Sequence, residues 1–310
     1  MTPTAGKARI RSGTMRAIRR GLPLYIMLLI PMLYIVVFRY LPLGGLVIAF
    51  KKYNIFKGIA ASPWVGLKYF REAFRAREFW TAIKNTLVLN LGSLLICFPF
   101  PIVFAVLLNE LNHPKLKKTT QTILYMPHFL STVIVVGIIY QVFGASGVVN
   151  NALAALGMEQ VSFLGNARNW RILYLGSNIW TGLGYGMIVY LAAIAGINTE
   201  LYDAAYIDGA GRWKRIWHVT LPQIRTTIVT MTVMNVGKIL SIGFEKPYLM
   251  SNVLVKDVSS VISTYVYSVG LQAGRYDYAT AVGLFQSVVA LCMVVAANSI
   301  ARRLGEEGIM

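Results

Sequence analysis

The sequence predicts an all-α membrane protein whose chain crosses the bilayer six times. Of its 310 residues, 56% are hydrophobic and only 14% are charged, and the mean hydropathy is +0.59. Because soluble domains carry about 25% charged residues, this composition argues against a soluble globular enzyme. The apolar residues also fall into long blocks, and a membrane-spanning helix needs about 20 mostly apolar residues.

The blocks that are long enough to span a bilayer are 22–40, 86–108, 123–143, 173–197, 225–243 and 279–300. They divide the chain into a basic N-terminal segment, residues 1–21, and a transmembrane domain, residues 22–310. The basic segment and the first block imitate a signal peptide, but no small-residue cleavage site follows, so we expect an uncleaved span. Apolar residues resume after Arg39 and continue through Phe50, which leaves open a bent or interfacial continuation.

Prolines and glycines inside the blocks predict how the spans bend and pack. Pro99 and Pro101 fall in the second block, and proline removes a backbone hydrogen bond and kinks a helix. Gly182, Gly184 and Gly186 fall in the fourth block, where small residues allow helices to approach closely.

The charge distribution predicts an orientation. The net charge is +18, from 30 basic and 12 acidic residues. A soluble protein with this charge would be a candidate for nucleic-acid binding, whereas membrane proteins gather basic residues in short cytoplasmic segments. Basic residues are denser in the segments that share a side with the N-terminus. We therefore expect both termini in the cytoplasm, with lipids and not nucleic acid as the partner of this charge.

The sequence offers little for catalysis. Cys97 and Cys292 lie in apolar blocks, and the three histidines are dispersed over different segments, so no metal-ligand spacing appears. We find no phosphate-binding glycine loop and no Gly-x-Ser-x-Gly motif. The spans also lack the acidic residues that proton relays use. We expect no metal, no cofactor and no enzymatic activity in this chain.

The segment 198–222, between the fourth and fifth spans, carries the most information. It predicts two short helices joined by a turn, with Asn198 or Thr199 as the first cap and Gly209 as the helix stop. Pro222 is suited to begin the fifth span, because its missing N–H costs little there.

The second short helix predicts an apolar stripe. Trp213, Ile216 and Trp217 follow one another at positions i, i+3 and i+4. Short helices that lie on the membrane surface would explain the tryptophans beside basic residues. The position of this loop between two membrane spans argues against a DNA-binding helix-turn-helix.

Asp203-Ala204-Ala205, then Asp208-Gly209-Ala210, then Ile216 and Leu221-Pro222, resembles the "EAA" loop of binding-protein-dependent ABC importer permeases. The chain has Asp203 where the family has Glu, so a salt bridge made there would be looser. Other stretches are similar to the sugar and polysaccharide branch of that family: Ser62–Leu67, Met126–Phe129, Tyr278–Ala281 and Ala297–Leu304.

The resemblance implies a type I ABC importer permease fold and a set of partners. Two permease subunits, the second expected to be a different chain, would form the pathway, two cytoplasmic ATPase subunits would drive it, and an extracellular or periplasmic binding protein would deliver a sugar or oligosaccharide. The protein would reside in the bacterial inner membrane. The residues implied in ATPase coupling are Asp203, Ala204, Ala205, Gly209, Ala210, Trp213, Ile216, Leu221 and Pro222.

Alternatives for the solute and for the driving force stay open. A permease of the same family could carry a peptide or a polyamine. An integral-membrane enzyme or an ion-coupled carrier belongs to a different class, and either would need intramembrane carboxylates that this sequence lacks.

Polar and aromatic side chains inside the spans are candidates for the translocation pathway. They are Asn178, Trp180, Tyr185, Asn235, Lys238 and Gln286. Lys238 could instead extend toward the membrane interface or pair with Glu245. Trp180 and Tyr185 suit stacking on sugars, although membrane aromatics more often pack against neighbouring helices.

Overall fold

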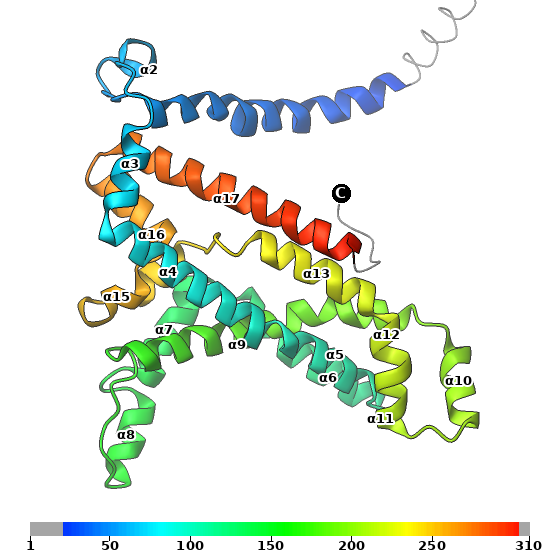
Figure 1. Cartoon of the computed structure of the whole chain (residues 1–310). Coiled ribbons are helices and arrows are strands. Elements are labelled where there is room, and N and C mark those ends of the chain that lie inside the picture. Colours follow the sequence, from blue (N-terminus) through cyan, green and yellow to red (C-terminus); the bar gives the residue numbers. More distant parts are fainter. Residues whose placement is uncertain (1–20, 304–310) are drawn as a thin grey trace, which may run out of the picture. The chain divides into compact units, whose positions relative to one another are not determined.

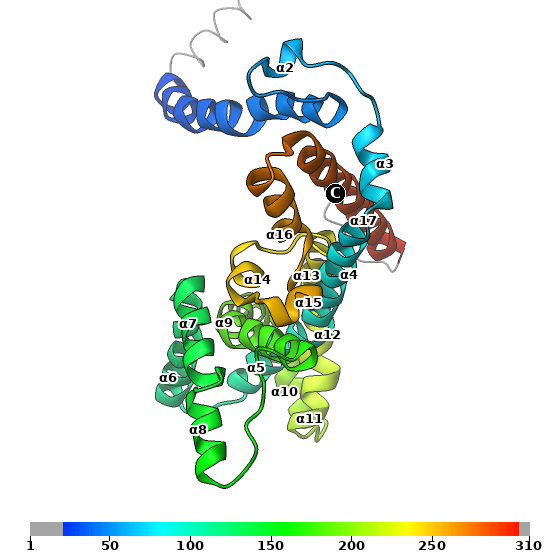
Figure 2. The ribbon, with the colours of Figure 1, turned by 90° about the vertical axis from the view of Figure 1, so that its left-hand side faces the viewer.

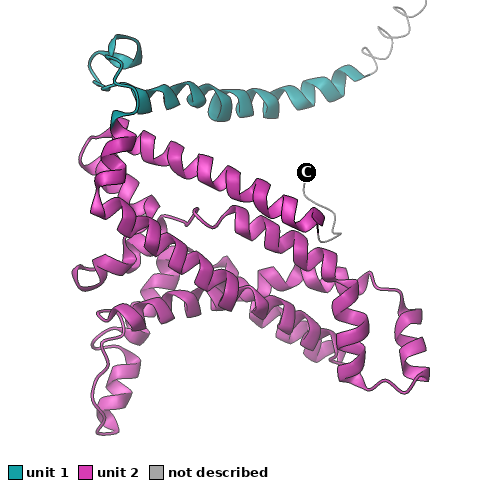
Figure 3. Ribbon diagram, viewed as in Figure 1, with its two compact units in different colours: residues 1–68 teal, residues 69–310 magenta. Residues whose placement is uncertain are grey.

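The computed structural model describes residues 21–303, and within that range the chain is helical apart from turns and one isolated β-bridge. The predicted all-α class is therefore confirmed. The chain divides into two compact units, residues 1–68 and 69–310 (Figure 3). Except for Gly21, the predicted basic segment 1–21 lies outside the described residues.

Unit 1 is built on one long apolar helical segment, Gly21–Phe50. Its second half is π-helical over Val36–Tyr40 (η1) and 3₁₀-helical over Leu41–Phe50 (η2). The first predicted span thus continues ten residues past its expected end, in helical form. None of its most apolar window is buried within the chain, as expected for a helix whose apolar side chains face lipid or another subunit.

A small closed loop follows the helix of unit 1. Lys51 and Trp64 form an antiparallel bridge, and the rings of Phe50 and Trp64 stack with centroids 5.7 Å apart. The Lys51 ammonium donates to the Ile59 carbonyl at 2.9 Å, next to the short helix α2 (Gly58–Ala61). The Ser62–Leu67 stretch noted in the sequence therefore turns back onto the end of the long helix.

Unit 2 contains the remaining helices (Figure 1). In chain order these are α3 (Lys68–Arg75), α4 (Arg77–Gly92), η3 (Ser93–Cys97), α5 (Pro99–Asn109), α6 (Pro114–Tyr125), η4 (Met126–Phe129), α7 (Thr132–Phe143), α8 (Val148–Ala155), α9 (Ala167–Ala195), α10 (Thr199–Ile207), α11 (Arg212–Arg215), η5 (Ile216–Thr220), α12 (Leu221–Gln223), α13 (Arg225–Gly237), α14 (Glu245–Met250), η6 (Val253–Val255), α15 (Lys256–Ser259), α16 (Ile262–Tyr267), η7 (Ser268–Gln272) and α17 (Tyr276–Arg303).

Five helical segments of residues 21–303 are long and apolar enough to cross a membrane by length and composition. They are Gly21–Phe50, Arg77–Asn109, Thr132–Ala155, Ala167–Ala195 and Tyr276–Arg303. The predicted spans 86–108, 173–197 and 279–300 fall within or almost within three of them. Ahead of Pro99, the helix widens into the π-helical η3, where the Phe98 N–H donates to the Ser93 carbonyl at 2.9 Å.

Two predicted spans differ from the observed helices. The helix expected over 123–143 is interrupted between Met126 and Ser131, where Pro127 and an extended Leu130 separate α6 from α7. The helix expected over 225–243 ends at Gly237. A Cβ at Gly237 would come within 2.6 Å of Val294 on α17. Apolar residues flank both breaks, so the expected apolar blocks ran across them, although Pro127 and His128 lie at the first break and Lys238 at the second.

The core of unit 2 lies along α9. At one end, Trp170 of α9 is fully buried, and its indole N–H donates to the Met250 carbonyl of α14 at 2.9 Å. Toward the other end, α9 packs along α5, and Met187, Tyr190 and Ile194 share a buried cluster with residues of α5. The α10 segment projects from one end of unit 2, and α8, α14 and α15 lie at the opposite end (Figures 1 and 2).

Glycines bring α9 close to its neighbours, as expected for two of the three predicted positions. A Cβ at Gly184 would overlap the Leu124 carbonyl of α6, and one at Gly186 would lie 2.9 Å from Pro101 of α5. Nothing lies within 4 Å of the same position at Gly182. Gly184 therefore sets how closely α9 and α6 approach.

Gly184→Ala should lower the stability of the protein, because the added methyl group meets a backbone carbonyl that cannot rotate away. Overpacking of this kind costs about 1–3 kcal/mol. Gly182→Ala is the matched control, since the same methyl group enters open space and should leave the melting temperature unchanged or raised. Thermal unfolding of the purified variants in detergent checks this, and equal melting temperatures would contradict the close contact.

Candidate functional site

The loop between α9 and the next long helix contains the two predicted short helices. The Asn198 side chain is the N-terminal cap of α10, and its Oδ1 accepts from the Glu200 N–H at 3.0 Å. The other end is closed by Gly209, whose φ of +73° lies in the left-handed region. There the Gly209 N–H donates to the Tyr206 carbonyl and the Ala210 N–H to the Ala205 carbonyl, the paired bonds that end a helix at glycine.

The outer face of α10 is open and presents small and apolar side chains. Asp203 and Ala204 are exposed, whereas Ala205 and Ala210 are half-buried. One turn along, Tyr206 and Ile207 leave 72% and 83% of their surfaces exposed. Large apolar side chains without a covering element in the same chain are typical of a surface that meets another protein.

The second half of the loop runs directly into the next long helix. From α11 the backbone continues through the π-helical η5 and α12 into α13, with a turn at Ile224. The sequence suggested that Pro222 begins the fifth span. In the structure Pro222 lies inside this helical path. The Leu221 N–H donates to the Ile216 carbonyl at the end of the π-helical turn, immediately before the proline, which has no N–H to donate.

The predicted stripe of Trp213, Ile216 and Trp217 is divided in the structure. Ile216 is 6% exposed and packs in the cluster formed by α5 and α9. Trp213 and Trp217 leave 70% and 65% of their surfaces exposed. Of the three residues of the stripe, Ile216 alone packs into this cluster. Leu221 also packs against this cluster, whereas Pro222 is exposed.

A hydroxyl pair that sequence reasoning missed ties α10 to this helix. The Tyr202 hydroxyl and the Thr220 hydroxyl are 3.0 Å apart, and Thr220 is 1% exposed. No local pattern signals this contact, because the two residues are 18 positions apart and belong to different helices. The capped α10 is therefore held against η5 by a partly buried hydrogen bond.

A separate cavity of about 480 Å³ lies between α4, η3, α5, α9 and α13. Such a volume is within the about 300–1,000 Å³ of small-molecule sites. Of the predicted pathway residues, Asn178, Tyr185, Asn235 and Lys238 line it. One face of the Tyr185 ring is covered, since His128 stacks on it with ring centroids 4.3 Å apart.

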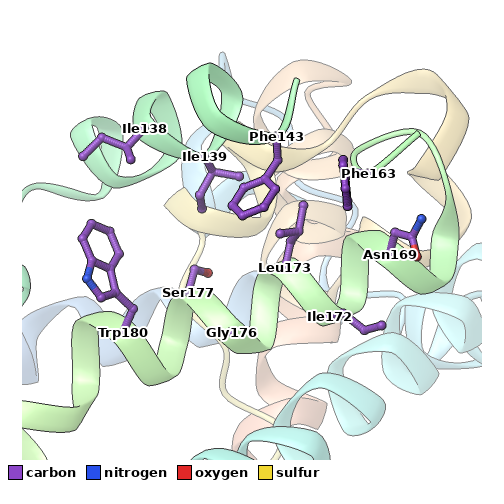
Figure 4. A pocket seen from close by; sticks show the side chains of 10 residues that line it. All are labelled: Ile138, Ile139, Phe143, Phe163, Asn169, Ile172, Leu173, Gly176, Ser177 and Trp180. Carbon is purple, nitrogen blue, oxygen red and sulfur yellow. The ribbon is translucent and has the colours of Figure 1, made fainter. Parts of the chain in front are cut away.

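The other two predicted pathway residues lie elsewhere. Trp180 lines a different, apolar pocket between α7 and α9 (Figure 4). Gln286 of α17 donates to the Leu240 carbonyl at 2.7 Å, and this bond supports the non-helical chain after α13. The pairing of Lys238 with Glu245 that the sequence left open does not occur, since neither side chain forms an ion pair within residues 21–303.

Lys246 of α14 is a further cationic group, which contacts the cavity wall through Asn178, and the sequence reasoning did not select it. Its ammonium donates to Asn178 Oδ1 at 2.7 Å and lies 5.3 Å from the centre of the Tyr174 ring. The Asn178 amide donates in turn to Ser93 Oγ at 3.2 Å. Burial lowers the pKa of Lys246 to about 8. Because Lys246 follows the predicted fifth span, only the tertiary fold brings it to Asn178.

The described residues hold no group of three or more His, Cys, Asp or Glu side chains that could bind a metal ion. The cavity lining offers amides, hydroxyls, aromatic rings and the Lys238 ammonium, and the Lys246 ammonium is hydrogen-bonded to one of the lining amides. Such groups hold a polar solute by hydrogen bonds and charge.

Comparison with known proteins identifies a family and relatives that this chain resembles. Residues 82–306 match the family described as "Binding-protein-dependent transport system inner membrane component". "Protein LplB" of Bacillus subtilis is 43% identical over 307 residues, which cover 99% of this chain and 96% of that protein. The "Polygalacturonan/rhamnogalacturonan transport system permease protein YteP" of the same organism is 44% identical, over 92% of this chain and 89% of its own.

A solved structure agrees with these relatives. It is described as a bacterial alginate ABC transporter in complex with an alginate pentasaccharide-bound periplasmic protein. One of its chains superposes with a TM-score of 0.87 at 43% identity, over 95% of this chain and 99% of that one. The resemblance drawn from residues 203–222 is therefore confirmed at the level of the family.

Tyr202→Phe should loosen α10, because it removes the hydroxyl that bonds to the buried Thr220. Loss of one hydrogen bond costs about 0.5–1.5 kcal/mol, so hydrogen exchange of the α10 amides should become about two- to tenfold faster. Tyr206→Phe is the matched control, since that exposed hydroxyl has no partner among the described residues. Equal exchange rates in the two variants would contradict the anchoring role.

Proposed function

The chain belongs to the family of binding-protein-dependent transport system inner membrane components, and from this premise we propose that it forms half of the pathway of an ATP-driven saccharide importer. Membership makes it a transmembrane permease subunit and not an enzyme, with ATP hydrolysis on a separate subunit. The observation that carries the proposal is the capped helix α10, most of whose side chains are exposed and which is hydrogen-bonded to the helical path that reaches the cavity.

The α10 loop is the proposed docking element for the ATPase. Ala204 is exposed, and its small side chain allows close approach of another backbone, while Ile207 adds apolar surface on the same side of the helix. The ends of α10 are fixed by Asn198 and Gly209. A short helix that is fixed at both ends moves as a rigid body when its partner moves.

A helical path that is interrupted by a turn at Ile224 supports the transmission of this movement. The Tyr202–Thr220 bond joins α10 to η5, and η5 continues through α12 into α13. The far end of α13 carries Asn235 and is followed by Lys238, and both line the cavity. A displacement of α10 by the ATPase would therefore reach the cavity wall through η5, α12 and α13.

Both the cavity and the relatives support a saccharide as the solute. Asn90, Ser93, Asn178, Asn235 and Ser241 line the cavity with amides and hydroxyls, groups that can exchange hydrogen bonds with sugar hydroxyls. Relatives at 43–44% identity over almost the whole chain include a permease named for polygalacturonan and rhamnogalacturonan transport. No feature of the described residues favours a peptide, a polyamine or an ion-coupled mechanism over this reading.

The proposed assembly contains one copy of this chain, a second permease, two ATPase subunits and an external binding protein. The family and the apolar helices support an integral inner-membrane location. Docking of α10 on a cytoplasmic ATPase would put both termini on the cytoplasmic side, in agreement with the density of basic residues. Lipids would cover the apolar side chains of Gly21–Phe50 that the chain leaves exposed.

Gly209→Val should uncouple ATP hydrolysis from uptake in proteoliposomes that contain the complete importer. The left-handed conformation at Gly209 costs other residues about 1–2 kcal/mol, so the native end of α10 should become about tenfold less populated. We expect hydrolysis to persist while uptake per ATP falls by about the same factor.

Gly211→Val is the control for this measurement. Gly211 has φ −66°, which valine adopts readily, and at both glycines nothing lies within 4 Å of an added Cβ. The two variants therefore differ only in backbone strain. If both coupled normally, α10 would not be the coupling element, and if wild-type uptake needed no ATPase subunit, the importer proposal would fail.

A further inference from the structure

The cavity beside α9 carries positive charge without a matching carboxylate. Its lining residues include Lys238 and no Asp or Glu, and Lys246 reaches the same wall through Asn178. Neither lysine forms an ion pair with any side chain in the part of the chain that the structure describes. Lys246 is half-buried and its ammonium contacts only the neutral Asn178 amide by hydrogen bonding, whereas Lys238 is exposed. A partly buried charge without a counter-charge is costly, so the arrangement is suited to a ligand that brings the negative charge.

We propose that Lys238 and Lys246 select saccharides that carry carboxylate groups, such as uronic acids, over neutral ones. The inference deepens the proposed function and depends on it, since it names the class of saccharide that the same cavity receives.

Lys246 is held in a defined position and retains unused hydrogen-bonding capacity. An ammonium group has three N–H donors, and one is directed at Asn178 Oδ1 at 2.7 Å. The Tyr174 ring, 5.3 Å from the ammonium, faces the charge from another direction. Because Asn178 lines the cavity, a carboxylate bound at Asn178 would contact the amide that the Lys246 ammonium holds in place.

Lys238 is placed by the break in the helix. It is the residue at which α13 ends, and the Asn90 amide of α4 donates to the Ile239 carbonyl at 2.7 Å just beyond it. The Lys238 side chain is exposed to the cavity. Had the helix continued to residue 243 as the hydropathy suggested, this lysine would have been an ordinary helical residue. The break fixes it on the wall instead.

The neutral side chains that line the cavity indicate which other groups the ligand carries. Asn235 bonds to its own helix through Nδ2, which donates to the Met231 carbonyl at 2.7 Å, and no group of residues 21–303 donates to its Oδ1. Ser241 is exposed and lines the same cavity. A ligand with hydroxyl groups and a carboxylate on one ring uses amide, hydroxyl and ammonium groups together.

The test compares a charged and an uncharged form of the same saccharide, in which methyl esters replace the carboxylates. Trigalacturonate and its fully methyl-esterified form are offered to proteoliposomes containing the complete importer, and ATP-dependent uptake of each is measured. The readout is the ratio of acidic to esterified uptake. A defect in folding or assembly lowers both rates equally and leaves the ratio unchanged.

The variants are Lys238→Met and Lys246→Met, with Lys238→Arg and Lys246→Arg as charge-retaining partners. Lys256→Met is the control, because that lysine is exposed on α15 and does not line the cavity. We expect the wild-type importer to prefer the acid, each Met variant to lower the ratio about tenfold, and the Arg and Lys256 variants to keep most of it.

Each other outcome overturns a defined statement. Equal uptake of both saccharides by the wild-type importer overturns the inference and leaves the proposed function standing. A preference for the acid that persists in both Met variants assigns selection to another subunit and overturns the role of the lysines. If neither saccharide, nor any neutral oligosaccharide, is taken up with ATP, the proposed function itself fails.

Discussion

The close packing of α9 against α5 and α6 is the constraint on which the rest of unit 2 depends. Gly184 lies against the backbone carbonyl of Leu124 and Gly186 against the ring of Pro101, so neither contact leaves room for a Cβ. The same helix carries Trp170 in the core toward α14 and Asn178 in the wall of the cavity. Near its other end, the cluster of α5 and α9 residues receives Ile216 from the loop. The core, the cavity and the loop therefore all contact the same helix, α9.

This shared frame explains how a surface loop can act on a distant cavity. Helix α10 is fixed by its own caps and by the Tyr202–Thr220 bond, and the helical path that starts at α11 ends at Lys238. The breaks in that path fall at the turn at Ile224 and after Gly237. Irregular backbone inside a membrane protein is tolerated where it lines a cavity, and the second break does so.

The sequence predicted the parts that depend on short-range chemistry. The cap at Asn198, the glycine stop at Gly209 and the apolar blocks of α9 and α17 all follow from neighbouring residues. It predicted less where distant contacts decide the outcome. Lys246 and Thr220 gained their roles only through helices far along the chain. The apolar residues on both sides of each break joined the expected helices 123–143 and 225–243 into single blocks. The sequence identified polar and aromatic residues within a span. It did not show which cavity each residue lines, as the position of Trp180 in a separate pocket demonstrates.

The most direct test of the coupling account is site-specific photo-crosslinking from α10 in native membranes. The crosslinking residue replaces Ile207, which is 83% exposed and lies one turn after Ala204. A second version places it at Lys256, at the opposite end of unit 2. The account predicts a covalent adduct with the ATPase subunit from position 207 only. Adducts from position 207 that contain lipid or the external binding protein but no ATPase would contradict it.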